Sequence, residues 1–530
     1  MKILFFSPYS LIWPDVVQEN QLTVILRKLG HEVKSIHCNK FFAKLCHMHE
    51  SAGLEVNSPL SQKDNLCKSC IQNANLYLGK TNEKKINLSN FRYSKDSEKV
   101  KSFISELENS NLELVQFQGI TVGKFVLSEI ILRHKKRSVI LSEDEFQLFK
   151  EILENCVSLV LASQNLLELH KPDIVMSYNP QYAMQSTFLA VAKSHSIRTL
   201  LLDGGPAINK LGTHTIIWDF AVHGYRNPAK QIWMLNSINP TKNEIELINN
   251  YYREVKDAKL AWVYSSSPKG LSTREFFQVP KTSKLFLLAM NSYDEVLGSG
   301  LLDEKFKKSH ESIVFRNQIE WIKFTIEYFR RTPNSFLIIR PHPRELPNKR
   351  EGKTAESVRD WMALSKNLPD NVVFDTPDLG FSIYDHFDEI DILLTGWSST
   401  SLDALYHDIP VITYDAELLG YPSSLVITGR SIREYESNLY ESMSKELKVN
   451  NREVLEWLVF YFFRGNIELG GGIKSRKPLS WFGKSSFFMR LITKLIPIPL
   501  QKLDLILSPK TKRHDKLNEL LYGVRTNLYS

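Results

Sequence analysis

The residues best suited to chemistry form a cationic string directly after an apolar segment. Residues 336–345 read Phe-Leu-Ile-Ile-Arg-Pro-His-Pro-Arg-Glu, so the guanidinium groups of Arg340 and Arg344 flank the imidazole of His342. The two prolines beside the histidine stiffen the chain and stop a strand from continuing. Such a cluster at the carboxyl end of a buried strand predicts an anion site, with a nucleotide phosphate as the obvious ligand. A solvated turn after the strand is the alternative.

A second polar string follows the apolar segment 392–395. It contains one glycine, one tryptophan and then four consecutive hydroxyl residues: Gly396, Ser398, Ser399, Thr400 and Ser401. Hydroxyl groups and free backbone N–H groups at the start of a helix can bind an anion. One such residue is enough for an N-cap, so four in succession favour a phosphate contact.

Two further pairs of residues follow expected strands and are candidates for contacts with donor or acceptor: Gly119 and Gly123 after 112–117, and Asp294 and Glu295 after 285–290. The glycines lack P-loop spacing, so an ordinary turn is the alternative. The two acids would contact the base or ribose of a nucleotide, or lie in a solvated loop.

Four of the five cysteines lie close together in the sequence, in the pattern C-x7-C-x20-C-x2-C: Cys38, Cys46, Cys67 and Cys70. A disulfide framework is unexpected in a large chain without an export signal. Four thiolates would close a tetrahedral site, so the sequence leaves two interpretations, a structural zinc or free thiols.

Length and composition indicate a multi-domain globular protein. The chain has 530 residues, of which 43% are hydrophobic and 24% charged. Two or three domains are expected at this length, and disordered, collagen-like and coiled-coil classes are excluded. The formal charge of +8 favours anionic ligands, and no RRM, KH or zinc-finger pattern indicates nucleic acid.

Apolar segments and helical spacings predict two α/β halves, 1–280 and 281–465. The first half is expected to contain strands at 3–7, 32–36, 112–117, 174–177 and 198–202, a helix at 18–29, and a polar insertion at about 38–101. The stretch from about 57 to 101, rich in Ser, Asn and Lys, looks like an insertion or a loosely structured loop. The second is expected to contain strands at 285–290, 336–339, 372–375, 392–395 and 411–413, with a helix at 313–331. Near-continuous apolar strands alternating with helices indicate parallel sheets covered on both faces. Polar stretches at 265–269 and 279–283 suggest a hinge, and two such halves would enclose a ligand cleft at the strands' carboxyl ends.

The segment 466–530 differs in character, because basic residues alternate with aromatic and aliphatic ones from about Lys474 onward. It is predicted to be a helical extension that packs across the domains or rests on anionic lipid. No uncharged apolar stretch approaches the length of a membrane span. A cytoplasmic protein is therefore expected, peripheral at the inner face of the inner membrane at most.

The His-Pro pair at 342–343 and the Ser-Ser-Thr run at 398–400 together resemble the paired motifs of bacterial sialyltransferases. They equally resemble those of the capsule polysaccharide synthesis proteins, which include the Kdo transferases. The resemblance covers 285–415 well and the first half loosely. It implies the two-domain GT-B glycosyltransferase fold, in which the second domain binds the nucleotide. It also implies that His342 contacts the donor phosphate and that Ser398, Ser399 and Thr400 hold the phosphate or neighbouring groups.

These families also carry an acidic-acidic-glycine motif that supplies a general base. Here Asp203, followed by Gly204 and Gly205, comes directly after an expected strand, but a leucine replaces the first acid. We prefer Asp203 as the base, with a turn aspartate as the alternative. The acidic stretch 142–145 lacks the glycine and is interpreted as a solvated helix face.

The sequence thus predicts an inverting glycosyltransferase that needs no metal, since no Asp-x-Asp pair stands at a strand end and Asp385 and Asp388 look like charges on a helix. The motifs favour a CMP-activated acidic sugar as donor, with UDP- and GDP-sugars as alternatives, and a glycan or lipid-linked acceptor of bacterial surface polysaccharide synthesis. Two other functions stay open, a sugar-nucleotide 2-epimerase and a non-catalytic scaffold that binds nucleotide or glycan.

Overall fold

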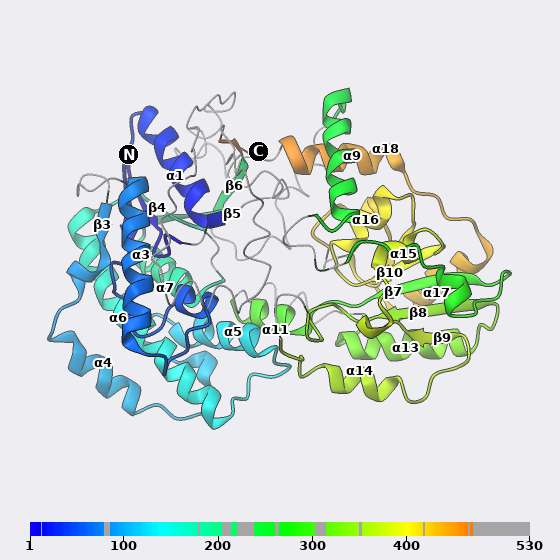
Figure 1. Cartoon of the computed structure of the whole chain (residues 1–530), viewed down its shortest axis with the longest axis horizontal. Coiled ribbons are helices and arrows are strands. Elements are labelled where there is room, and N and C mark those ends of the chain that lie inside the picture. The colour runs from blue at the N-terminus through cyan, green and yellow to red at the C-terminus, as the bar shows by residue number, and fades with distance from the viewer. Residues whose placement is uncertain are drawn as a thin grey trace. The chain divides into compact units, whose positions relative to one another are not determined.

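The computed structural model describes residues 1–11, 13–78, 85–178, 181–203, 214–219, 238–259, 264, 266–302, 314–348, 352–416, 419–464 and 467–469. They form two compact units (Figure 1). The first comprises the described residues within 1–130, 139–222 and 465–530, and the second those within 131–138 and 223–464. The described residues within 223–280, which the sequence grouped with the first half, therefore belong to the second unit.

The first unit is built on a seven-stranded sheet with the strand order β13-β6-β5-β4-β1-β2-β3. The strands are β1 (Lys2–Phe6), β2 (Glu32–His37), β3 (Lys85–Asn87), β4 (Ile174–Tyr178), β5 (Arg198–Asp203), β6 (His214–Asp219) and β13 (Ile467–Glu468). Strands β1 to β5 pair in parallel, whereas β6 and β13 add antiparallel at one edge. Because β2 and β3 extend the sheet on one side of β1 and β4 and β5 on the other, the strand order reverses between β1 and β4. Ligands of open parallel sheets bind at such a reversal, beyond the carboxyl ends of the strands.

Helices connect the strands of the first unit: α1 (Trp13–Lys28), α2 (His47–Ser51), α3 (Leu60–Leu78), α4 (Asp96–Ser105), α5 (Val122–His134), α6 (Glu143–His170) and α7 (Ala183–Ser194). Short 3-10 turns lie at η1 (Leu88–Phe91) and η2 (Leu112–Leu114). Gly30 ends α1 with a φ of +87°, the left-handed C-cap conformation that glycine adopts without penalty. Buried side chains of β1, β4 and β5 pack with α1 into one core.

Two expectations for the first half were wrong. The segment 112–117 is not a strand, because it forms η2 and then a tight turn in which Phe117 and Ile120 make an isolated bridge. The polar segment within 38–101 is not loosely structured, since it contains the 19-residue helix α3 and strand β3. Polar residues of α3 are buried by pairing: the Lys63 ammonium donates to the carbonyls of Lys44 at 2.6 Å and Val56 at 2.5 Å.

The second unit is built on a six-stranded, fully parallel sheet with the order β12-β11-β10-β7-β8-β9. Its strands are β7 (Lys284–Ala289), β8 (Ser335–Arg340), β9 (Val372–Phe374), β10 (Ile392–Thr395), β11 (Val411–Thr413) and β12 (Ile427–Thr428). The five strands expected from the sequence are confirmed, and β12 is additional. The strand order reverses between β7 and β10, which makes that edge the expected ligand position.

The helices of the second unit are α9 (Lys242–Lys256), α10 (Thr273–Phe276), α11 (Tyr293–Leu302), α13 (Gln318–Arg330), α14 (Val358–Leu364), α15 (Ile383–Phe387), α16 (Thr400–Tyr406), α17 (Ile432–Ser444) and α18 (Asn451–Val459). Shorter helical turns lie at η5 (Pro377–Leu379), η7 (Ser423–Leu425) and η8 (Phe460–Arg464). Four of the longer helices begin with a side chain that caps an orphan N–H group: Thr241, Asn317, Ser431 and Asn450.

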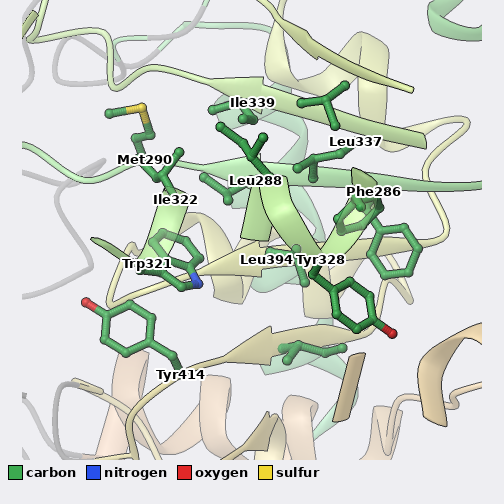
Figure 2. Close-up of a cluster of buried hydrophobic side chains, with 14 of the residues drawn as sticks. Phe286, Leu288, Met290, Trp321, Ile322, Tyr328, Leu337, Ile339, Leu394 and Tyr414 are labelled. Atoms are coloured by element: carbon green, nitrogen blue, oxygen red, sulfur yellow. The ribbon is translucent and has the colours of Figure 1, made fainter. Parts of the chain in front are cut away.

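A continuous apolar core fixes the sheet of the second unit. Figure 2 shows Leu288 of β7, Ile339 of β8 and Leu394 of β10 packed together with Trp321 of α13, all fully buried. The Trp321 indole N–H donates to the Tyr435 hydroxyl at 2.8 Å, so its one polar atom is satisfied inside the core. The strands are therefore held rigidly, and the loops at their carboxyl ends project from a fixed base.

The prediction of an α/β chain with two Rossmann-like units is confirmed by these strand orders. The segment 466–530 begins with β13, which pairs with β6, and its remainder from 470 lies outside the described residues together with the helical extension expected there. Among the described residues, no helix is long and apolar enough to cross a membrane.

Candidate functional site

The carboxyl edge of the second sheet gathers the two polar strings that the sequence singled out. In the order β10-β7-β8, strand β7 lies between the strand that precedes the serine-rich loop and the strand that precedes the His-Pro loop. Both loops therefore emerge on either side of the end of β7, next to the reversal of strand order. Parallel pairing brings them to the same edge although more than fifty residues separate them in sequence.

His342 is held as a neutral hydrogen-bond donor. Its Nδ1 accepts the backbone N–H of Arg344 at 3.2 Å, and the Tyr264 ring packs edge-on against it at 5.9 Å. Burial, followed by the charges of Arg344 and Lys135, lowers the pKa of His342 to about 3. Because Nδ1 accepts, the neutral ring carries its proton on Nε2. His342 can thus donate one hydrogen bond to an anionic oxygen across the usual pH range, but it is unsuited to proton transfer near neutrality.

Arg344 joins the two acids that follow β7. Its guanidinium pairs with the buried Asp294 carboxylate, lies 3.5 Å from a Glu295 oxygen, and donates to the Ser292 hydroxyl at 3.2 Å. The structure thus brings a predicted donor residue and the two predicted cleft acids into one ion-pair cluster. Its guanidinium also donates to the Leu132 carbonyl at 3.2 Å, in the segment 131–138 of the same unit, so Arg344 fixes the His-Pro loop against both α11 and that segment.

Two buried residues that the sequence did not assign also position the His-Pro loop. Lys135 lies within the second unit and donates from Nζ to the carbonyls of Arg344 at 2.6 Å and Lys353 at 2.7 Å. Glu345 accepts the Ser357 hydroxyl and the backbone N–H of Tyr293, and burial raises the pKa of its carboxyl to about 7. Glu345 ends the motif string itself, so only its proximity to the histidine could have indicated it.

Arg340 is committed to a buried network, contrary to the expectation that it binds donor phosphate. Its guanidinium pairs with the Asp375 carboxylate and donates to the Phe381 carbonyl at 2.9 Å. His386 Nε2 lies 2.9 Å from the same carboxylate oxygen, and its Nδ1 lies 2.9 Å from the Thr273 hydroxyl. Both ring nitrogens are satisfied when Nε2–H donates to Asp375 and Nδ1 accepts from Thr273. Arg340 therefore anchors the end of β8 through β9 and α15.

Of the four hydroxyl residues after β10, one is buried and three are partly or fully exposed. The Ser401 hydroxyl is fully buried and donates to the Ser398 carbonyl at 2.8 Å. The Ser398 hydroxyl accepts the backbone N–H of Thr400 at 3.3 Å and lies 3.0 Å from the Thr400 hydroxyl. Ser399 is exposed at the start of α16. Ser401 therefore serves the local fold, and Ser398, Ser399 and Thr400 are the hydroxyl residues left to meet a ligand.

A glycine suits the position after β10 because the chain passes close to side chains that follow β7 and β11. A Cβ atom on Gly396 would lie 3.1 Å from the Asn291 side-chain oxygen and 3.3 Å from the Tyr414 ring. The same Asn291 oxygen lies 3.4 Å from the backbone N–H of Trp397. Gly396 thus permits the serine-rich loop to dock on the loop after β7.

Asp385 is a buried structural residue, which corrects its interpretation as a helix-face charge. Its carboxylate accepts the backbone N–H groups of Lys269 at 2.8 Å, Gly270 at 2.9 Å and Ser382 at 2.8 Å. The described part of the suggested hinge at 265–269 is therefore tied to α15. Asp388 matches its prediction, being largely exposed and paired with Lys256 at 3.3 Å.

In the first unit, Asp203 is the last residue of β5 and so stands at the carboxyl edge of the sheet. Gly204 and Gly205 lie outside the described residues. The rival acidic stretch at 142–145 forms the N-terminus of α6, where Ser142 and Glu145 make a reciprocal capping box. That stretch is thus a helix start, as the sequence favoured.

Glu19 of α1 is a buried acid at the reversal of strand order that the sequence did not reveal. It is only 4% exposed, and its carboxyl accepts from the Ser7 hydroxyl after β1 and from the Tyr178 backbone at the end of β4. Burial outweighs these hydrogen bonds and raises its pKa to about 8. It lines a small cavity with Ser7, Ser10 and Asn20. An acid in a polar helix gives no sequence signal of this environment.

The raised pKa of Glu19 predicts how stability depends on pH. Because its folded pKa of about 8 exceeds the ordinary carboxyl value of 4.5, the folded chain binds the proton more tightly than the unfolded chain does. The resulting stabilisation is complete below about pH 4.5 and is lost as the pH rises through about 8. We expect the melting temperature of Glu19→Gln to fall less between pH 5 and pH 9 than that of the wild type. Glu98→Gln, at an exposed site of α4, is the control. Equal slopes in all three proteins would contradict the prediction.

Gly119 and Gly123 have local structural tasks. Gly119 has a φ of +78° in the turn between Phe117 and Ile120. A Cβ atom on Gly123 would meet the Leu112 carbonyl oxygen at 1.9 Å, and its N–H donates to the Val115 carbonyl at 3.0 Å. A positive φ accounts for Gly119, and the close backbone approach accounts for Gly123.

The four clustered cysteines line one cavity of about 20 Å³ together with His37 and His49. Tetrahedral zinc with bonds of about 2.3 Å needs sulfur atoms roughly 3.8 Å apart. Within the described residues, the one group of three or more potential ligands lying within 4.8 Å of one another is His47, Glu50 and Glu129. Burial raises the pKa of Cys38 to about 12 and that of Cys70 to about 11, so these thiols are protonated at neutral pH. The free-thiol interpretation fits this geometry.

No protein-family model matches this sequence, and no curated protein matches it. Among solved structures, the chain is similar to Thermosulfurimonas dismutans KpsC, beta Kdo 2,7 transferase, at 13% sequence identity and a TM-score of 0.32, covering 58% of this chain and 82% of that one. It is also similar to the UDP-GlcNAc 2-epimerase from Neisseria meningitidis bound to UDP-GlcNAc, at 12% identity and a TM-score of 0.26, covering 87% and 94%. A third is CalG4, the calicheamicin glycosyltransferase, at 12% identity and a TM-score of 0.25, covering 88% and 94%. The architecture described above rests on the strand orders of the two sheets.

Proposed function

We propose that this protein is a glycosyltransferase that moves a sugar from a nucleotide-sugar donor to a glycan or lipid-linked acceptor in bacterial surface polysaccharide synthesis. One observation carries the proposal. The His-Pro loop follows the carboxyl end of β8, and the serine-rich loop follows the carboxyl end of β10. These two strands flank β7 in one parallel sheet, beside the reversal of strand order. Nucleotide phosphates bind at this position in doubly wound sheets.

The residues of this edge suit a departing nucleotide phosphate. His342 offers a neutral Nε2–H donor, and Ser398, Ser399 and Thr400 offer hydroxyl groups. Donors fixed in advance at the position where negative charge develops stabilise a transition state without reorganisation. Arg344 adds positive charge nearby, although its ion pair with Asp294 partly neutralises that charge. The donor phosphate would thus be bound without a metal, and a CMP-activated acidic sugar is the favoured donor, ahead of UDP- and GDP-sugars.

Inverting transfer also needs a base that accepts the proton of the acceptor hydroxyl. Asp203 is our candidate because it ends β5 at the carboxyl edge of the first sheet. Glu19 is the rival, since its carboxyl is buried at the same edge beside β1 and β4. The proposed site of action is the cytoplasmic side of the inner membrane, where lipid-linked acceptors would be available.

The first experiment is a thermal-shift screen with CMP, CDP, UDP, GDP and dTDP. We expect one nucleotide to raise the melting temperature, because a ligand at about 100 times its dissociation constant adds roughly 2.7 kcal/mol of stability. His342→Ala should abolish this shift, since it removes the Nε2–H donor. His195→Ala is the matched control, because this exposed histidine follows α7 in the first unit.

The responding nucleotide then defines the donor class for a transfer assay. A shift that survives in His342→Ala would place nucleotide binding elsewhere and contradict the proposed donor site. No shift with any nucleotide would favour the non-catalytic scaffold. Donor binding followed by interconversion of the free sugar nucleotide, without an acceptor, would instead indicate a 2-epimerase.

A further inference from the structure

Three potential metal ligands converge at the carboxyl edge of the first sheet, outside the proposed donor site. His47 and Glu50 lie one turn apart on α2 and so share a face, with His47 Nδ1 3.7 Å from a Glu50 carboxylate oxygen. Glu129 reaches the same point from α5, and one atom of each residue lies within 4.8 Å of the other two. One imidazole and two carboxylates are thus brought together by segments almost eighty residues apart.

The surroundings hold these side chains in place. A Glu129 oxygen accepts the backbone N–H of Ala183 at 2.9 Å, at the start of α7. The Tyr182 ring packs against the imidazole of His47 with centroids 4.0 Å apart, and the centroid of the Tyr9 ring lies 6.2 Å from that of the imidazole. Hydrogen bonds and packing that orient ligands in this way are typical of metal sites.

The imidazole offers a coordinating atom that the described residues leave without a hydrogen bond. His47 Nδ1 is inaccessible to solvent and has no hydrogen-bond partner among them. A buried polar nitrogen in this state is costly unless something binds it. The Glu50 carboxylate lies 3.7 Å from this nitrogen, beyond hydrogen-bond range, and one cation could bind both groups.

We propose that His47, Glu50 and Glu129 bind a divalent cation. One nitrogen and two carboxylates suit a first-row ion such as Mn²⁺, for which oxygen ligands are favourable and an imidazole is acceptable. Bonds of about 2.1 Å require ligand atoms roughly 3 Å apart, so small side-chain rotations close the site. Three protein ligands leave coordination positions for water or for an oxygen of an anionic ligand. This site goes beyond the proposed transferase function, and its test does not depend on that function.

The site lies where a ligand of the first unit is expected. Tyr9 follows β1, His47 follows β2 and Tyr182 follows β4, so the cluster is assembled from loops at the carboxyl ends of three adjacent strands. The reversal of strand order falls between β1 and β4.

The test is Mn²⁺ binding to the full chain, measured by electron paramagnetic resonance after chelator treatment and removal of the chelator. We expect about one Mn²⁺ per chain and a nitrogen coupling from the imidazole. The double variant Glu50→Gln, Glu129→Gln should weaken binding by at least about 100-fold, because it removes both carboxylate ligands. His47→Gln should remove the nitrogen coupling and provides a second test if the double variant does not fold.

Two controls separate this site from others. Glu98→Gln removes an exposed carboxylate of α4 and should leave binding unchanged. Cys67→Ser with Cys70→Ser removes thiols of the neighbouring cavity and should also leave Mn²⁺ binding unchanged. Absence of binding at about 1 mM Mn²⁺, roughly the weak limit of useful affinity, would overturn the proposal. Equal binding by the wild type and the folded carboxylate variant would overturn it as well.

Discussion

Asp203→Asn is expected to lower the rate of sugar transfer by about 10²- to 10⁴-fold, the usual contribution of a positioned general base. The substitution keeps the size of the side chain but removes its basicity. Nucleotide binding should be unaffected, because the proposed donor residues belong to the other unit. A large loss of kcat with unchanged nucleotide affinity is therefore the result that the assignment requires. The measurement is turnover of the donor chosen by the thermal-shift screen.

A matched control lies at the opposite edge of the same sheet. Asp173 precedes β4 and accepts the backbone N–H of Lys2 at 2.7 Å. Asp173→Asn makes the same chemical change far from the carboxyl ends of the strands, so kcat should stay within about twofold. If Asp203→Asn also stayed within twofold, Asp203 would not be the base. If Glu19→Gln then lowered kcat by a factor in the range expected for loss of a general base, Glu19 would be assigned as the base instead.

The second large effect concerns stability. Asp375→Ala is expected to destabilise the folded chain by about 3–5 kcal/mol, because it leaves the buried Arg340 guanidinium without its carboxylate partner. His386 loses the acceptor of its Nε2–H at the same time. The Asp375 side chain is fully inaccessible and that of Arg340 is 12% exposed, so water cannot readily replace the lost pairing. Urea unfolding measures the change in free energy.

Asp378→Ala is the control, because this exposed aspartate lies three residues further along the chain. It should change the free energy of unfolding by no more than about 0.5 kcal/mol. The effect of Asp375→Ala should extend to nucleotide binding, since Arg340 directly precedes the His-Pro loop. A destabilisation below about 1 kcal/mol would show that the network does not anchor the end of β8.

Much of the second unit followed from local pattern. Its predicted strands are short apolar runs, and β7, β8 and β10 are buried on both faces, so they can be recognised from the sequence alone. The two polar strings at 340–344 and 398–401 could be located for the same reason, since each directly follows a strand. Their common edge could be expected too, because parallel strands with helical crossovers align their carboxyl ends.

Two segments show where local pattern fails. The apolar residues of 112–117 alternate as in a strand, yet the close approach of Gly123 to the Leu112 carbonyl and the turn at Gly119 hold a different shape. The helix α3 is polar enough to resemble a loop. Its buried Lys63 is stabilised by carbonyl groups of Lys44 and Val56, neither of which belongs to the helix.

The sequence by itself determined the two α/β halves, most of their strands, and the pair of loops proposed to hold the donor phosphate. Only the tertiary structure decided which charged residues are available to a ligand. It paired Arg340 with Asp375 from the next strand, buried Glu19 beside β1 and β4, and brought Glu129 to His47 and Glu50. The physical reason is that periodicity and strand ends are local properties, whereas the burial and pairing of a charge depend on residues distant in the chain.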